Sequence, residues 1–151
     1  MRGFEIVALA RKGDDKLRQR SQGAPARPLL IFEQRDGRYA LAGRNDDVVL
    51  KADEGGQCDP FLDGDATIAT KGQYFTVQNG VACGEHWTDY VTFRFDDRAG
   101  GFVFDNERLE AWELNPSNDP QAEALVPAEP PRLIRDKAGL TTPFAAWRPK
   151  R

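Results

Sequence analysis

Polar and apolar residues alternate through much of the first 115 residues, and the clearest alternation runs from Trp87 to Phe95. One side of this segment carries Trp87, Val91, Phe93 and Phe95, and the other carries Thr88, Tyr90, Thr92 and Arg94. A period of two residues is typical of a β-strand with one buried face. The segment therefore predicts a strand in an antiparallel sheet.

Two hairpins are expected along the chain. Residues 29–33 and 39–42 flank Asp36-Gly37, a dipeptide that favours the positive φ angles of a tight two-residue turn. Residues 74–77 form the first strand of a second hairpin, and residues 87–95 form its return strand. Further strands are expected at residues 4–9, 46–50, 102–104 and 109–114. The predicted core consists of Ile6, Val7, Leu9, Leu30, Phe32, Val77, Val91, Phe93 and Phe95.

The character of the chain changes after Asn115, where prolines become frequent. We expect residues 116–151 to form a Pro-rich extended tail that packs on a domain of residues 1–115, with Phe144 and Trp147 as its anchors. A helical turn at residues 121–124 and a frayed basic end at 148–151 are part of this expectation. The predicted fold is mainly β, with antiparallel sheets in a sandwich-like or propeller-like arrangement.

Composition narrows the functional classes. The chain has 151 residues, 40% of them hydrophobic, and a formal net charge of −3. This balance argues against a dedicated nucleic-acid binder, because such proteins need a dense basic face. Apolar runs fall short of the ~20 residues that span a bilayer, and residues 6–10 are too short for a secretory signal.

The expected strand at residues 4–9 begins almost at the first residue, whereas natural termini more often start with loose residues. We therefore expect a leader or upstream segment that has been removed. An alternative start and a natural cytosolic form remain open.

Cys58 and Cys83 each stand close to glycine, so both are expected in loops. Loop cysteines are often paired or reactive. A disulfide between them and two free thiols are both consistent with the sequence. A zinc site that uses both cysteines and His86 is a further alternative, although the C-x-x-C spacing of structural zinc sites is missing.

The sequence Cys83-Gly84-Glu85-His86 places a thiol, a carboxylate and the only histidine within four residues. Along a strand, three residues span about 10 Å, which is too far for a nucleophile and its base. A hairpin tip explains the segment better. Glu85 and Asp89 share a face about 13 Å apart, so solvated charges are favoured over an acid and base pair.

Three aspartates, Asp59, Asp63 and Asp65, crowd one loop with Gly64. Hard oxygen ligands in a flexible loop suit calcium, but their spacing differs from that of an EF-hand. Polar turn residues explain the loop without an ion. No other cofactor is expected.

Three short segments of the chain resemble the motifs of a known group of proteins. They are Asp59-Pro60-Phe61, residues 72–77 and residues 90–95. Together they resemble a block of the form G-D-P-F, G-x-F-T-x and Y-T-F-R-Y in bacterial envelope proteins, many of which carry propeller-like FG-GAP repeats. The resemblance covers residues 4–114. Cys58 stands where a glycine is usual, the calcium loop expected upstream is missing, and the tail has no counterpart.

This resemblance implies a periplasmic or secreted β protein, because some relatives are immunity proteins that inhibit lysozyme-like toxins. The first hypothesis is therefore a non-enzymatic protein-binding domain whose partner is a lysozyme-like cell-wall hydrolase. Its candidate binding residues are Glu85, His86, Trp87 and Tyr90, since exposed aromatic residues mark interfaces. A small hydrolase with a site around His86, and a structural fragment of a larger β assembly, are the alternatives.

Overall fold

The computed structural model describes residues 2–14, 23–63 and 68–150. The strands are β1 (Gly3–Ala8), β2 (Arg27–Arg35), β3 (Arg38–Val49), β4 (Ile68–Lys71), β5 (Tyr74–Cys83), β6 (Glu85–Asp96), β7 (Gly101–Leu114), β8 (Leu125–Pro127) and β9 (Arg132–Ile134). A single turn of 3₁₀ helix follows at Phe144–Ala146. No helix in these residues is long and apolar enough to cross a membrane.

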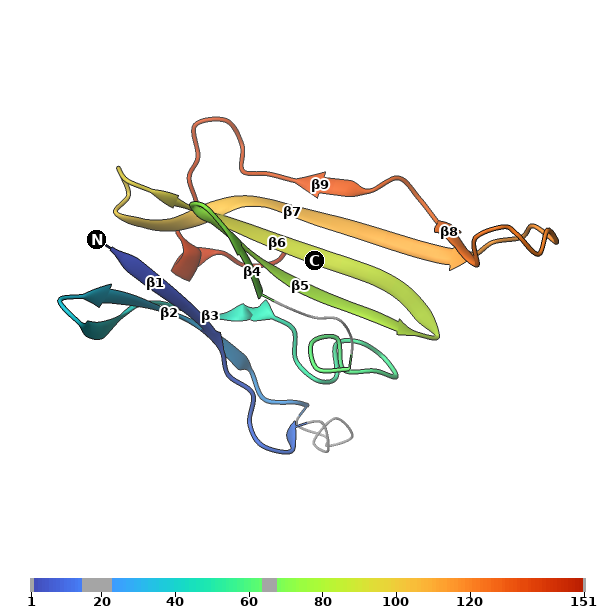
Figure 1. The fold of residues 1–151 in the computed structure, drawn as a ribbon, viewed down its shortest axis with the longest axis horizontal. Helices are drawn as coiled ribbons and strands as arrows, with labels where there is room; N and C mark the ends of the chain where they lie inside the picture. The colour runs from blue at the N-terminus through green and yellow to red at the C-terminus, as the bar shows by residue number, and fades with distance from the viewer. Residues whose placement is uncertain (1, 15–22, 64–67, 151) are drawn as a thin grey trace.

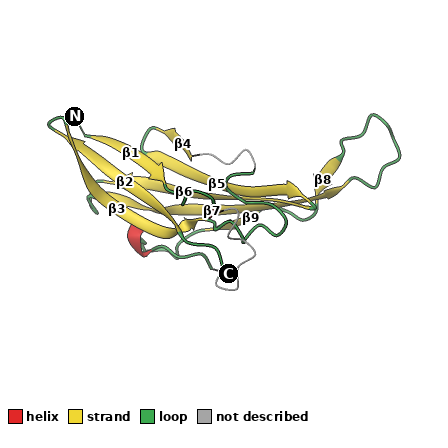
Figure 2. Ribbon diagram, turned by 90° about the horizontal axis from the view of Figure 1, so that it is seen from below, coloured by secondary structure: helices red, strands yellow, loops and turns green. Residues whose placement is uncertain are grey.

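The strands form two antiparallel sheets that face each other as an open sandwich (Figures 1 and 2). The small sheet has the order β1-β2-β3. The large sheet has the order β4-β5-β6-β7-β8, and β9 also pairs with β7. The mainly β, antiparallel prediction is confirmed, and the arrangement is sandwich-like and not closed.

Both predicted hairpins form, and both are longer than expected. Asp36 and Gly37 have φ angles of 50° and 73°, the signs that a type I′ turn requires. The strand expected at residues 46–50 is the continuation of β3. The second hairpin pairs β5 with β6 from Tyr74–Arg94 to Cys83–Glu85.

The core lies between the two sheets. Its fully buried members are Leu29, Ile31, Val48, Val49, Phe75, Val77, Val91, Phe93, Phe104, Phe144 and Trp147. The face assignment for β6 is confirmed, since Val91 and Phe93 are both 0% exposed. Phe93 contacts Phe75, Phe144 and Trp147, with ring centroids 5.1–5.9 Å apart.

The core prediction for the small sheet is wrong for four residues. Leu30 and Phe32 lie on the outer face of β2, where Val7 of β1 pairs with Leu30, and Leu9 is 47% exposed. The inner positions of β2 are held by Leu29 and Ile31. The run from Leu29 to Phe32 is apolar throughout, so it carries no alternation from which the buried side could be chosen. Ile6 packs against the margin of the core.

The segment after Asn115 follows the edge of β7 that β6 leaves unpaired. β8 pairs with residues 112–114, β9 pairs with residues 107–109, and the Phe104 amide donates to the Thr142 carbonyl (2.8 Å). Phe144 and Trp147 are buried, and Asn45 Nδ2 donates to both of their carbonyl oxygens at 2.7 and 3.0 Å. Residues 119–122 form a reverse turn where a helical turn was expected.

Two buried polar side chains join the strands to the loops that follow β1 and β3. Asn79 on β5 accepts from the Leu50 amide (3.0 Å) and donates to the Val48 carbonyl (3.0 Å). Arg27 on β2 is 0% exposed and holds Asp14 on one side and Asp59 on the other. Since an unpaired buried charge is costly, this triad fixes the 51–63 loop relative to the small sheet.

Candidate binding surface at the end of the long hairpin

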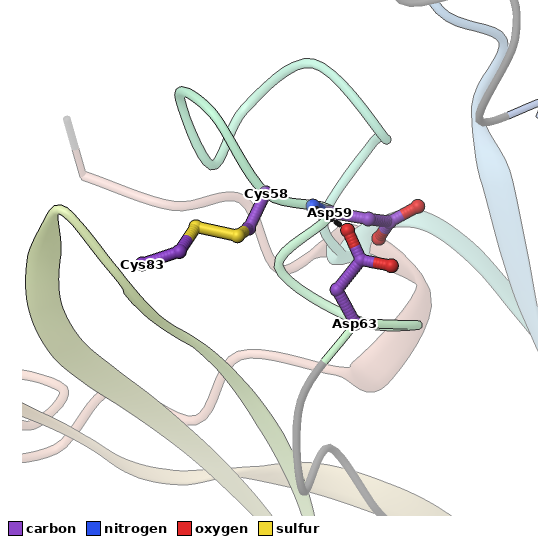
Figure 3. The surroundings of a disulfide bond; sticks show 4 residues. All are labelled: Cys58, Asp59, Asp63 and Cys83. Carbon is purple, nitrogen blue, oxygen red and sulfur yellow. Dashed lines mark hydrogen bonds between the residues drawn. A yellow bond between two sulfur atoms is a disulfide. The ribbon is translucent and has the colours of Figure 1, made fainter.

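The disulfide Cys58–Cys83 joins the 51–63 loop to the tip of the β5–β6 hairpin (Figure 3). The two Cα atoms are 6.2 Å apart and 25 residues separate them in sequence. Of the alternatives that the sequence left open for the two cysteines, the disulfide is therefore the one that forms. Both sulfur atoms are bonded, so Cys83 offers no thiol to His86 and neither cysteine is a thiolate ligand for zinc.

The loop that carries Cys58 is tightly closed. A Cβ atom on Gly55 would lie 2.3 Å from the Cys58 carbonyl oxygen, so the close approach of these backbones requires glycine. The Gly80 amide donates to the Pro60 carbonyl (2.8 Å) and joins the same loop to β5. The hairpin tip is therefore held against the sandwich by covalent and backbone contacts.

Asp59 organises this loop. Its carboxylate binds Arg27 and also accepts from the amides of Phe61 and Leu62, each at 3.0 Å. Burial opposes the charge of Asp59, but the hydrogen bonds from Arg27 and the two amides outweigh it, so the pKa of Asp59 lies below its ordinary value. Burial likewise disfavours the charged Arg27, yet contacts with Asp59 and Asp14 outweigh it and raise the pKa of the guanidinium.

The aspartates of the calcium hypothesis have other contacts. Asp59 is turned to Arg27, and Asp63 Oδ2 accepts from the Asp59 amide at 2.7 Å (Figure 3). Asp65 lies outside the described residues. Among the residues that the structure describes, no three His, Cys, Asp or Glu side chains are grouped so as to hold a metal ion.

The β5–β6 hairpin and β7 extend past the small sheet, toward β8 (Figure 1). In this projecting part, His86 pairs with Ala82 on one side and with Trp112 on the other, and Trp112 pairs with Pro127. Leu114 pairs with Leu125 one step further along. These six residues share the face of the large sheet that points away from the small sheet. We call Ala82, His86, Trp112, Leu114, Leu125 and Pro127 the distal surface.

The four predicted binding residues do not share one face. His86 and Tyr90 lie on the same side as the distal surface, with Tyr90 about 13 Å farther along β6. Glu85 and Trp87 lie on the opposite side, where Trp87 pairs with Val81 and Ala111. The alternation of side chains along β6 therefore divides the four predicted binding residues between two faces. His86 is the one at the centre of the distal surface.

The distal surface exposes two neighbouring large apolar side chains. Leu114 is 76% exposed and Trp112 is 36% exposed. His86, Trp87 and Trp112 line two adjoining hollows of about 510 and 490 Å³. An exposed tryptophan beside exposed leucine, in a hollowed surface, is the arrangement in which binding energy concentrates at protein interfaces.

No known protein family, curated protein or solved structure matches this chain.

The charge around the distal surface has one sign. Residues 82–88 and 110–127 contain no lysine and no arginine. They contain five carboxylates, at Glu85, Glu110, Glu113, Asp119 and Glu123. Glu110 shares the face of the distal surface and pairs with Arg108, whereas Glu85 and Glu113 lie on the opposite face of the same strand ends. The end of the large sheet that carries Trp112 therefore has a net negative charge.

The sequence pattern did not single out Trp112 or Leu114, and the expectation that Asp89 is a solvated charge is wrong. Asp89 is only 4% exposed, and it lies on the same side of β6 as Trp87 and Val91. The sequence did contain a signal for this burial, because Asp89 occupies an inward position in the alternating pattern of the strand. Glu107 on β7 is equally buried, at 4%.

Proposed function

We propose that this protein is a non-enzymatic binding domain that recognises another protein through the distal surface. The observation that carries the proposal is the exposed pair Trp112 and Leu114 at an end of the sheet with a net negative charge. A partner with a basic surface or cleft would complement that charge and gain both steering and specificity.

The construction of the site supports binding. The distal surface is built on paired strands, and the disulfide and the 51–63 loop support the hairpin tip from the opposite side. A rigid anchor loses little conformational entropy on association, which favours affinity. Trp112 supplies the type of side chain that is enriched among the strongest contacts of interfaces.

A lysozyme-like cell-wall hydrolase is the partner that we propose. The resemblance of residues 4–114 to envelope proteins that include immunity proteins supports this choice. Hydrolases that act on anionic cell-wall polymers benefit from basic surfaces, which the negatively charged end of the sheet would match. Disulfides persist in oxidising compartments, so we also propose a periplasmic or secreted location for this protein.

The test is to mix the protein with the lysozyme-like hydrolases encoded nearby in the same genome and to follow peptidoglycan clearing. Wild type should inhibit, and Trp112→Ala or Leu114→Ser should weaken inhibition by at least about tenfold, as for an interface anchor. Leu41→Ser is the matched control, because Leu41 is 58% exposed on the small sheet, away from the distal surface.

Two outcomes would overturn the proposal. One is equal inhibition by Trp112→Ala and wild type. The other is the absence of inhibition together with a measurable turnover that His86→Ala abolishes, which would favour the small hydrolase. A dimer of wild type that Trp112→Ala converts to a monomer would instead assign the distal surface to a second copy of the chain.

A further inference from the structure

A separate pocket lies on the inner face of the large sheet, where the small sheet no longer covers it. Its volume is about 370 Å³. Its walls are formed by Leu50, Glu54, Trp87, Asp89, Glu107, Leu109, Arg132 and Lys150. This pocket lies behind the distal surface, on the other side of β6 and β7.

The floor of the pocket is acidic. Asp89 pairs with Leu109 and Glu107 pairs with Val91, so the two acids occupy diagonal positions on neighbouring strands, about 7 Å apart between Cα atoms. Both residues are 4% exposed. Arg132 and Lys150 are exposed and therefore stand at the rim.

Glu107 has no partner among the residues that the structure describes. No hydrogen bond or ion pair reaches its carboxylate, and neither Arg132 nor Lys150 comes within ion-pair distance of it. Glu107 is 4% exposed, so its carboxylate is largely desolvated, and a donor or cation that reached it would stabilise its charge. Glu107 lines the pocket, so the pocket is the place from which that donor would come.

The remaining walls suit an alkyl chain. Trp87 stands two residues before Asp89 on the same face, and Leu109 lies directly beside Asp89 on β7. An aromatic face attracts a cation by its quadrupole, and a leucine side chain packs against methylene groups. We infer that this pocket binds an organic cation, an ammonium or guanidinium group on an alkyl chain, with the charge against Glu107.

Two kinds of ligand carry such a cationic group. One is a free amine, and the other is the lysine or arginine side chain of a peptide. The experiment titrates the full chain with agmatine, cadaverine and a blocked Gly-Arg-Gly peptide by calorimetry. Pentanol and glucose are the uncharged controls. Binding of the peptide assigns the source to a side chain, whereas binding of agmatine or cadaverine without the peptide assigns it to a free amine.

Glu107→Gln is the decisive variant, because it removes the charge and keeps the shape. It should weaken binding of the cations by at least about tenfold, which corresponds to one interaction of about 1.4 kcal/mol. Glu113→Gln, an exposed change on the same strand, should leave binding unaltered. Trp112→Ala should also leave it unaltered, so this site and the proposed partner surface can fail independently.

Three results would overturn the inference. They are absence of binding by every cation, equal affinity for pentanol or glucose, and equal affinity of Glu107→Gln and wild type. Because Gln is better tolerated than an unpaired buried carboxylate, the urea midpoint of Glu107→Gln should match or exceed that of wild type. A loss of binding in a variant that is still folded is therefore attributable to the missing charge.

Discussion

Replacement of Arg27 by methionine tests whether the buried triad holds the 51–63 loop in place. Arg27 and Asp59 side chains are fully buried, and the Asp14 side chain is 2% exposed. Arg27 Nε and Nη2 donate to Asp14 at 2.8 and 2.9 Å, and Nη1 donates to Asp59 at 2.6 Å and to the Leu50 carbonyl at 3.2 Å. Methionine fills similar space but leaves two buried carboxylates without a cation.

The expected loss is about 3–5 kcal/mol at pH 7, the usual cost of removing one partner of a buried ion pair. That is a large part of the roughly 5–15 kcal/mol by which domains are stable. Urea unfolding followed by far-UV circular dichroism measures it. Arg44→Met is the matched control, because the Arg44–Asp46 pair is solvent-exposed and should cost no more than about 1 kcal/mol.

The pH dependence adds a signature that a packing defect would not give. In wild type the pKa of Asp59 is depressed, so its contribution is complete above its ordinary value of 3.8 and is lost as the pH falls below it. In Arg27→Met the same burial without the cation should raise the pKa of Asp59. The variant should therefore recover stability between pH 7 and pH 5, where wild type changes little from this source. A loss below about 1 kcal/mol, or no recovery on acidification, would refute the reasoning.

Two further outcomes are expected. Phe93→Ala should cost about 3–5 kcal/mol, because Phe93 is 0% exposed and fills the centre of the core; a urea midpoint equal to that of wild type would contradict this. Replacing both Cys58 and Cys83 with serine should cost about 3.5 kcal/mol, the loop-closure estimate for a 25-residue separation. The unreduced, denatured wild type should show no free thiol on titration, and two free thiols would contradict the bridge.

Local rules were sufficient for the hairpins and for β6. Asp36-Gly37 determines its turn by the φ angles that it tolerates, and the alternation around Val91 and Phe93 identifies the buried side without knowledge of any partner. The loop setting of Cys58 and Cys83 left a disulfide and free thiols open, and the compact 51–63 loop brings the two residues together. These features depend on short-range geometry that the residues themselves encode.

Features that depend on a paired strand or on the opposite sheet were not predictable from the sequence. The buried side of β2 is decided by which side of Leu29 to Phe32 meets the large sheet. On β7, a register shift between the pairs at Thr92 and Phe93 makes Phe104 and Glu107 inward residues, although three positions separate them. A β-bulge of this kind reverses the alternation, so Glu107 could not be assigned to the inner pocket and Trp112 could not be assigned to the outer surface.

The overhang of the large sheet also implies a gradient of motion along single strands. β6 begins at the projecting tip (Figure 1). It continues into the core, where the ring of Phe93 packs against that of Phe144. Amide hydrogens near Phe93 should therefore exchange with solvent only through global unfolding, whereas those near Trp87 should exchange through local opening. The disulfide at Cys83 limits that opening, so its reduction should accelerate exchange at the tip and leave the amides near Phe93 almost unchanged. One strand thus belongs to two cooperative units, a persistent core and a tip whose local opening the disulfide restrains.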